Sequence, residues 1–173
     1  MYYPEINKWI IPISAVRVSL DELAHDGNHG NEGICLWLGN RGEEGLAIVS
    51  HCVLLRGEYI KKSPMNITIQ PELLREVHEK AQEHDLTLLG QIHSHAIIAG
   101  VDLSWVDKKY GVSAPGYLSV VAPGYALTPG TTLMECGIHV FMPRKGYVRL
   151  SDGEVRNRVL LEKSATCSTF TIG

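Results

Sequence analysis

The sequence has no excess of basic residues. Its 173 residues include 16 lysines and arginines against 19 aspartates and glutamates, which gives a formal net charge of −3. A surplus of positive charge is what drives non-specific binding to phosphate backbones. We therefore expect no nucleic acid among the partners of this protein.

Cysteines are few and are not paired along the sequence. Cys35, Cys52, Cys136 and Cys167 are widely scattered and form no C-x-x-C pair. This spacing predicts neither a disulfide framework nor a zinc site built from thiolates. A reducing cytoplasm is the simplest environment for such a chain, so we expect a cytoplasmic protein.

Long hydrophobic runs are missing as well. No apolar stretch approaches the roughly 20 residues that are needed to cross a bilayer. The segment 1–18 contains two prolines and Lys8, where a secretory signal peptide would need an unbroken apolar core. The sequence therefore predicts a soluble protein without membrane contact.

The length fits one globular domain, over residues 1–173, with a single sizeable core. Hydrophobic periodicity and turn residues predict a mixed α/β fold without internal repeats. The predicted strands are Trp9–Val18, Ile34–Gly39, Gly45–Leu55, Leu86–His95, Leu118–Ala122, Gly137–Met142 and Tyr147–Leu150.

Helices are predicted at three places. We expect a capped helical turn at Ser19–Ala24, an amphipathic helix that begins at Pro71 and ends near Asp85, and a helix that begins at Ser104. The segment 63–70 is interpreted as a connection. The tail, 163–173, is rich in Ser and Thr and is either a poorly ordered terminus or an edge strand.

Eight histidines in 173 residues are a surplus that suggests metal or acid–base chemistry. His93-Ser94-His95 stands at the end of a predicted strand, where the two-residue period places His93 and His95 on the same side. Two imidazoles, a third protein ligand and a water make an open, catalytic zinc site. Taken alone, however, an H-x-H pair more often consists of two half-exposed histidines.

Carboxylates that could complete such a site lie on both sides of this pair in the sequence. A helix that begins at Ser104 places its hydroxyl and the Asp107 carboxylate on one face, although Ser-x-x-Asp in isolation is a helix capping box. Glu32 precedes the apolar run Ile34–Leu38. It is either an ordinary charge at a strand end or the base that a zinc hydrolase needs.

In these residues the sequence resembles the JAMM metallopeptidases, the catalytically active members of the MPN-domain family. Their motif is an upstream glutamate, His-x-His, about seven residues, Ser, two residues and Asp. Glu32, His93, His95, Ser104 and Asp107 match this motif in order. The resemblance extends over about half of the chain, to the strand that follows the motif helix, and the combined motif is fairly specific.

The sequence departs from the family pattern in one loop. Eight residues, 96–103, separate His95 from Ser104 where the family usually has seven, and Ala96 takes the place of a common proline. We expect a loop that is bulged by one residue, because strict spacing would put apolar residues in the places of Ser and Asp. Asp102 is the fallback carboxylate.

The resemblance implies a single MPN-like domain, in which helices flank a mixed, mostly antiparallel sheet, with a cytidine-deaminase-like architecture. It implies that His93, His95 and Asp107 hold one Zn²⁺. Glu32 would be the general base, and Ser104 would help to stabilise the oxyanion. The implied reaction is hydrolysis of the bond after the C-terminal glycine of a ubiquitin-like protein, in deconjugation or in precursor processing.

The small size is similar to that of stand-alone prokaryotic members, which implies a role in a bacterial ubiquitin-like antiphage conjugation system. The expected partner is a ubiquitin-like protein or its conjugates, bound by loops 56–66 and 123–132. A homodimer is left open. Two alternatives also stay open: a catalytically silent MPN scaffold or binding subunit, and a JAMM hydrolase that acts on a sulfur-carrier protein or a small-molecule adduct.

Overall fold

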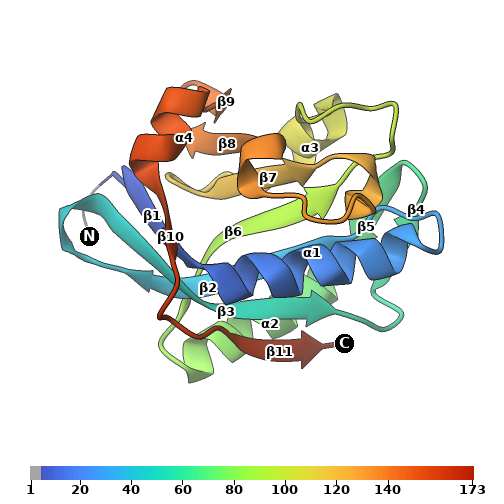
Figure 1. Cartoon of the computed structure of the whole chain (residues 1–173). Coiled ribbons are helices and arrows are strands. Elements are labelled where there is room, and N and C mark those ends of the chain that lie inside the picture. The colour runs from blue at the N-terminus through green and yellow to red at the C-terminus, as the bar shows by residue number, and fades with distance from the viewer. Residues whose placement is uncertain (1–4) are drawn as a thin grey trace.

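One mixed β-sheet organises the computed structural model, which describes residues 5–173 (Figure 1). Its strand order is β10-β1-β3-β2-β6-β7-β8-β9, and β11 pairs with β3 next to the segment that β1 uses. The strands of this sheet are β1 Lys8–Pro12, β2 Ile34–Arg41, β3 Leu46–Leu55, β6 Thr87–Ser94, β7 Leu118–Ala122, β8 Gly137–Met142, β9 Gly146–Arg149, β10 Val159–Glu162 and β11 Ser168–Ile172. Strands β4 Ile60–Ser63 and β5 Asn66–Ile69 form a separate hairpin.

The sheet is mixed, as predicted, but it is not mostly antiparallel. Among the described residues, four of its strand pairings are antiparallel and four are parallel. The parallel pair that matters for the site is β6 with β7, which places the end of β6 beside the end of β7. Parallel neighbours need a crossover connection, and the one between β6 and β7 carries helix α3, Trp105–Tyr110.

Two helices cover opposite faces of the sheet. Helix α1, Ile13–Gly27, packs on one face, and α2, Pro71–Glu83, packs on the other (Figure 1). Successive side chains of β2 point to opposite faces of the sheet, so the strand contributes to both cores. Trp37 packs in the core on the α1 side, whereas Leu36 and Leu38 pack in the core on the α2 side. The fold is thus a mixed sheet between helices, in agreement with the predicted α/β class.

The remaining helical segments are short. They are α4 Asp152–Arg158 and the 3₁₀ turns η1 Glu43–Gly45, η2 Gly124–Ala126 and η3 Leu133–Glu135. No helix within residues 5–173 is both long enough and apolar enough to cross a bilayer.

The predicted strand Trp9–Val18 is wrong in its second half. Strand β1 ends at Pro12, and α1 begins at Ile13. Pro12, with φ of −57°, is the N-cap residue, and the buried positions that follow recur with the helical rather than the strand period. Ser19 consequently lies inside the helix instead of capping it, where its hydroxyl donates to the Ala15 carbonyl at 2.7 Å.

Three further regions differ from the prediction or decide between the alternatives that the sequence left open. The connection 63–70 takes part in the β4–β5 hairpin. The tail is an edge strand, since β11 pairs with β3 in parallel. Helix α4 and strand β10 were not predicted, although Ser151 and Glu154 form the capping box at the start of α4.

A partly buried ionic cluster joins α1 to Arg56, just after β3, and to Lys62 of β4. The Glu22 carboxylate accepts hydrogen bonds from both terminal nitrogens of Arg56, and Lys62 Nζ lies 2.7 Å from Asp26 Oδ2 and 3.7 Å from Glu22 Oε1. Burial alone would raise the pKa of Glu22, but Arg56 and Lys62 hold it below its ordinary value. The charges in this cluster neutralise one another.

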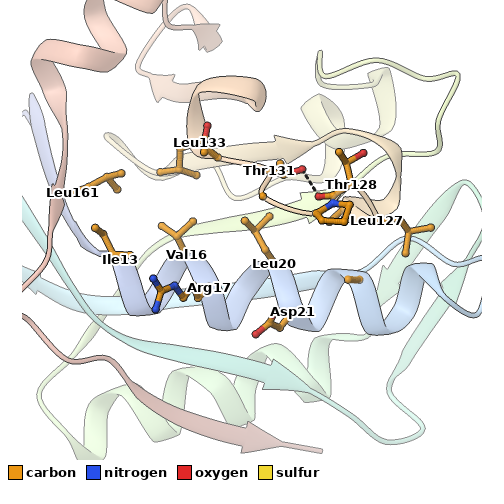
Figure 2. Close-up of a pocket in the computed structure, with 15 residues that line it drawn as sticks. Ile13, Val16, Arg17, Leu20, Asp21, Leu127, Thr128, Thr131, Leu133 and Leu161 are labelled. Atoms are coloured by element: carbon orange, nitrogen blue, oxygen red, sulfur yellow. Dashed lines mark hydrogen bonds between the residues drawn. The ribbon is translucent and has the colours of Figure 1, made fainter.

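A cavity of about 590 Å³ lies between α1 and the segment after β7 (Figure 2). Val16 and Leu20 of α1 face Leu127 and Leu133 across it, and Arg17 and Asp21 stand at its border. Its lining is mostly apolar, and it holds no cluster of metal-ligating side chains among the described residues.

Candidate metal site

Two histidines converge where β6 ends. His93 is the last residue but one of β6, and His95 is the first residue after the strand. Since they are two positions apart, both side chains project to the same side, as the sequence predicts. Their Nε2 atoms are 3.2 Å apart. Both are buried, with 3% and 4% of their surface exposed. They are therefore not the half-exposed pair that an isolated H-x-H motif would suggest.

Asp107 joins the histidines from the first turn of α3. Its Oδ2 lies 3.2 Å from His95 Nε2, and its Oδ1 lies 3.6 Å from His93 Nε2. His93, His95 and Asp107 form the one group of three or more His, Cys, Asp or Glu side chains, among the described residues, whose ligand atoms all lie within 4.8 Å of one another. Asp107 is therefore placed as predicted, despite the longer loop before it.

The pKa values of His95 and Asp107 depend on the contacts within this group. Burial would raise the pKa of Asp107, but the hydrogen bonds with His93 and His95 hold it far below its usual range. Burial would lower the pKa of His95, but Asp107 raises it above the ordinary value. Three lone-pair donors that meet in a buried place thus require a cation between them, either protons or a metal ion.

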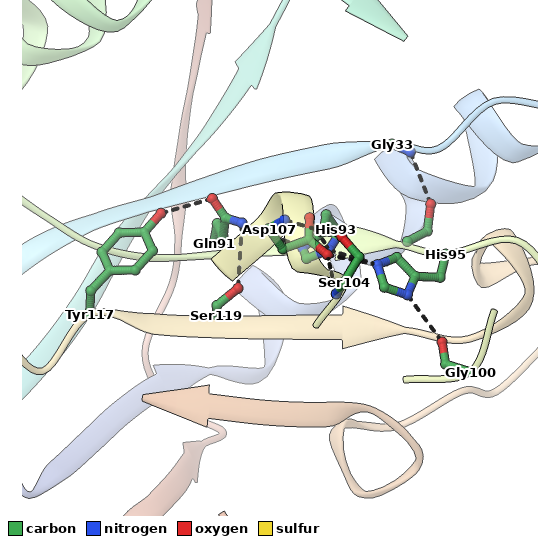
Figure 3. Close-up of polar contacts among 10 residues, drawn as sticks. Gly33, Gln91, His93, His95, Gly100, Ser104, Asp107, Tyr117 and Ser119 are labelled. Atoms are coloured by element: carbon green, nitrogen blue, oxygen red, sulfur yellow. Dashed lines mark hydrogen bonds and ion pairs between the residues drawn. The ribbon is translucent and has the colours of Figure 1, made fainter. Parts of the chain in front are cut away.

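The backbone fixes the orientation of His95. Its Nδ1 lies 3.2 Å from the Gly100 carbonyl oxygen, which can only accept a hydrogen bond (Figure 3). The proton of neutral His95 therefore belongs on Nδ1, and Nε2 presents its lone pair to Asp107 and His93. This is the second contact that metal-ligating histidines generally make.

Glu32 lies close to the group but outside it. The residue is buried, with 7% of its surface exposed, and it lines the same cavity as His93 and Asp107. Burial raises the pKa of Glu32, and the charge of Asp107 raises it further. Glu32 does not belong to the set of close ligand atoms. A carboxylate held beside a ligand group, with a pKa shifted toward neutrality, has the properties of a general base.

The cavity beside the group has a volume of about 420 Å³. Its lining includes the segment 66–69, which is strand β5, and Val106, Tyr110 and Val112 on α3 and the loop after it. Strands β2 and β6 contribute apolar residues such as Leu36 and Leu88. Polar ligand residues at one end and a largely apolar channel beyond them are typical of a substrate site.

Two of the predicted residues have a different setting. Ser104 is the N-cap of α3: its hydroxyl accepts from the Asp107 N–H at 3.1 Å, while its own N–H donates to Asp107 Oδ2 at 2.8 Å. It does not line the cavity. Asp102, the fallback carboxylate, is exposed and pairs with Arg149 at 2.6 Å, and it lies outside the ligand group. The bulged loop thus delivers Asp107 rather than Asp102.

A hydrogen-bond chain next to His93 was not predicted. The Tyr117 hydroxyl donates to Gln91 Oε1 at 3.0 Å, and Gln91 Nε2 lies 3.4 Å from both His93 Nδ1 and Ser119 Oγ (Figure 3). Tyr117 and Ser119 are each 1% exposed. The strand period could have indicated Gln91, since residues 91 and 93 share a face; the partners from β7 could not be read from the sequence.

The segment that carries Glu32 is hydrogen-bonded to the end of β6, which carries the histidines. The N–H of Gly33 donates to Ser94 Oγ at 2.9 Å, and the N–H of Ser94 donates to the Gly33 carbonyl at 3.0 Å (Figure 3). Ser94 is completely buried. The middle residue of the His-Ser-His triplet therefore holds the segment that carries Glu32 against the segment that carries the histidines.

The β4–β5 hairpin is attached at its tip on two sides. The N–H of Glu32 donates to the Ser63 carbonyl at 2.9 Å, and the Tyr125 hydroxyl donates to the Pro64 carbonyl at 2.8 Å. The Tyr125 N–H in turn donates to the His95 carbonyl at 2.8 Å. Tyr125 has a positive φ of 57°, a strained conformation for a residue with a side chain, so the surrounding contacts hold it there.

The loops expected to contact substrate divide between the two cavities. Asn66, at the end of the segment 56–66, lines the cavity beside the metal ligands. The segment 126–132 instead lines the cavity along α1. Tyr125 is the residue of that loop that reaches the candidate site, through its bonds to Pro64 and His95.

Comparison with known proteins gives one named relative. A probable metalloprotease of Sinorhizobium fredii, y4jG, is 29% identical over 127 residues, which cover 72% of this chain and 76% of the relative. No protein-family model matches the chain.

Solved structures share the fold. The solution structure of protein DSY2949 from Desulfitobacterium hafniense is 16% identical and has a TM-score of 0.61, covering 91% of this chain and 94% of that one. A Salinibacter ruber protein is 19% identical and has a TM-score of 0.52, covering 90% and 93%. These likenesses concern the fold alone.

Proposed function

We propose that this protein is a JAMM-type, zinc-dependent peptidase. The observation that carries the proposal is the convergence of His93, His95 and Asp107, with Glu32 held beside them in one cavity. The relative named a probable metalloprotease supports a peptidase or hydrolase function in general terms. The order of the five motif residues supports the narrower assignment.

The donor set fits zinc. Two neutral imidazole nitrogens and one carboxylate are common ligands of catalytic zinc, which keeps a further position open for water. The Gly100 carbonyl fixes His95 in the required tautomer, and the low pKa of Asp107 keeps its carboxylate ionised at neutral pH. A bound zinc ion would supply Lewis acidity and a more acidic water molecule.

Glu32 and Ser104 have separate roles in the proposed reaction. The Glu32 carboxylate accepts a proton from the attacking water and returns it to the leaving amine, for which a raised pKa is suitable. Ser104 holds Asp107 through the capping box and so keeps this ligand in place. No nucleophilic side chain is needed.

Strand β5, which lines the cavity, favours an extended peptide as substrate. Strand β5 pairs with β4 along one edge, and its other edge is not paired within the part of the chain that the structure describes. Such an edge can bind a peptide by strand addition, with side chains that enter an apolar channel. We propose that the C-terminal tail of a ubiquitin-like protein occupies this channel, as a conjugate or a precursor in a bacterial antiphage conjugation system.

The test is a cleavage assay with matched variants. The full chain is loaded with Zn²⁺ and incubated with a ubiquitin-like protein that carries a C-terminal extension after its final glycine, and the products are weighed by mass spectrometry. We expect cleavage after the glycine by the wild type and about 10²- to 10⁴-fold slower cleavage by Glu32→Gln. Cleavage of neither this substrate nor a sulfur-carrier protein, by a chain that does bind zinc, would favour a binding subunit instead.

A further inference from the structure

The side chain of Gln91 has polar neighbours on β6, on β7 and in the residue just before β7. It lies on the same face of β6 as His93 and is held between that imidazole, the Tyr117 hydroxyl and the Ser119 hydroxyl, at 3.0 to 3.4 Å (Figure 3). A carboxamide has one end that accepts and one end that donates hydrogen bonds, and the two ends have the same shape. Which end faces His93 therefore depends on whether Nδ1 of His93 donates or accepts a hydrogen bond.

A bound metal ion determines which end of the Gln91 carboxamide faces His93. His93 Nε2 faces His95 and Asp107, so a metal in the ligand group binds His93 through Nε2. The proton of the neutral imidazole must then be on Nδ1, which needs an acceptor. The polar atom next to Nδ1 is the amide nitrogen of Gln91, 3.4 Å away. Two donors cannot bond to each other, so in the metal-bound protein the carboxamide turns its oxygen to His93.

The turned carboxamide satisfies its other neighbours too. Its oxygen can also accept from the Ser119 hydroxyl, and its NH₂ group can donate to the Tyr117 oxygen, since both hydroxyls donate or accept. The Tyr117 oxygen then accepts from Gln91 and its proton no longer bonds to Gln91. We propose that Gln91 is a positioning residue: it accepts from His93 Nδ1–H, fixes the tautomer in which Nε2 binds the metal, and thereby raises metal affinity.

This proposal rests on the proposed metal site, and zinc affinity of the full chain separates the two. Zn²⁺ is titrated in competition with a chromophoric chelator into the wild type, Gln91→Leu, Gln91→Glu and the exposed control Gln82→Leu. We expect Gln91→Leu to bind zinc about 10- to 100-fold more weakly, as for other residues behind metal-bound histidines. Gln91→Glu, which still accepts a hydrogen bond, retains the affinity, and Gln82→Leu is unchanged.

Two results would overturn these assignments separately. If the wild type binds no zinc, the metal site itself is wrong and the role of Gln91 is wrong with it. If the wild type binds zinc and Gln91→Leu binds it equally well, the metal site stands and Gln91 is structural. Equal losses in Gln91→Leu and Gln91→Glu would also overturn the proposal, because Glu still accepts a hydrogen bond. Nitrogen-15 spectra of the zinc-loaded wild type must show His93 protonated at Nδ1.

An independent observation concerns two thiols on the other face of the sheet. Cys52 of β3 and Cys167, just before β11, have their Sγ atoms 3.4 Å apart. Thr169 faces Cys52 in the parallel ladder, so Cys167, two residues earlier, projects to the same side. Cys52 is completely buried and Cys167 is partly exposed. The bond between the thiols lowers the pKa of Cys167 and raises that of Cys52.

We infer that Cys52 and Cys167 form a peroxide-sensitive disulfide site. The Cys167 thiolate attacks hydrogen peroxide, the O–O bond breaks, and a sulfenic acid and one water are formed. The Cys52 thiol then attacks the sulfenic sulfur and releases a second water, so that two thiols and one peroxide give one disulfide and two waters. The bond would tie the C-terminal strand β11 to β3.

The test is peptide mapping after treatment of the full chain with one equivalent of hydrogen peroxide and alkylation of the remaining thiols. We expect a Cys52–Cys167 cross-linked peptide that is lighter by two hydrogens, with Cys136 still alkylated. In Cys52→Ser, Cys167 should instead be trapped as its sulfenic acid by dimedone. A linked Cys35–Cys52 peptide, or Cys167 oxidised to the same products in the wild type and in Cys52→Ser, would overturn the assignment.

Discussion

Two clusters of charged or titratable side chains lie within this fold, and only one of them contains its own cations. In the cluster next to α1, the carboxylates Glu22 and Asp26 meet the cations Arg56 and Lys62, so the charges balance within the chain. At the end of β6, two imidazoles and a carboxylate present lone pairs to one another, and no Lys or Arg is paired with them in the ion pairs of the described residues.

The difference separates a structural cluster from a functional one. A balanced ionic cluster specifies how α1 sits on the strands and requires nothing from outside. A cluster of ligand atoms without its own cation is completed by a metal or by protons, and such unbalanced groups in cavities are typical of functional sites. The same comparison predicts opposite consequences for mutation: loss of function at one cluster, and loss of stability at the other.

The largest effect is expected from Asp107→Ala. It removes one of three ligands, so we expect loss of bound zinc and a fall in peptidase activity on the order of 10⁴-fold, since the metal and the role of Glu32 are lost together. Metal analysis of the purified chain and the cleavage assay measure both. Asp102→Ala is the matched control and should keep its zinc; zinc retained by Asp107→Ala would move the ligand role elsewhere.

A smaller loss of activity is expected from Glu32→Gln. The amide cannot accept the proton, so turnover should fall by about 10²- to 10⁴-fold, while zinc content stays at the wild-type value because Glu32 lies outside the ligand group. Turnover near that of the wild type would remove Glu32 from the mechanism.

The structural cluster should respond in stability only. Glu22→Gln leaves Arg56 and Lys62 without their shared carboxylate, and we expect a loss of about 1–3 kcal/mol in the free energy of unfolding. The value is moderate because the Arg56 side chain is 41% exposed and water screens it. Urea denaturation measures it. Zinc content should not change, and a coupled loss of zinc would show that the two clusters are not separate.

The smallest effect is the acid dependence of that stability. The pKa of Glu22 is below its ordinary value of 4.5 in the folded protein. A lowered carboxylate pKa contributes stability above pH about 4.5, and the contribution is lost as pH falls through the folded value. The stability difference between the wild type and Glu22→Gln should therefore shrink on acidification below that pH. A difference that stays constant down to pH 3 would contradict the role of the carboxylate charge.

Much of the site could be predicted because its signals are local. The strand period brings His93 and His95 together, and the capping box places Asp107 in the first turn of α3. The choice between Asp107 and Asp102 needed the course of the loop 96–103, which no local pattern determines. Gln91 was missed because its partners Tyr117 and Ser119 come from the neighbouring strand.

For the fold, too, local elements could be predicted from the sequence and long-range contacts could not. The strands that carry the site were predicted within a few residues, but Trp9–Val18 was not, because β-branched and apolar residues occur both in β1 and on the buried face of α1. The pairing of β11 with β3, and of β10 with β1, joins segments more than 100 residues apart. Such contacts depend on packing of the whole chain and leave no periodic signal.

The attachment of the β4–β5 hairpin has a kinetic consequence. Its tip is bonded to Glu32 on one side and to Tyr125 on the other, so the wall of the channel is in place before anything enters. A site of this kind does not close over its substrate as a lid does. Capture of a peptide tail would then be limited by collision and orientation of the tail, and the association rate should show no saturation with rising substrate concentration.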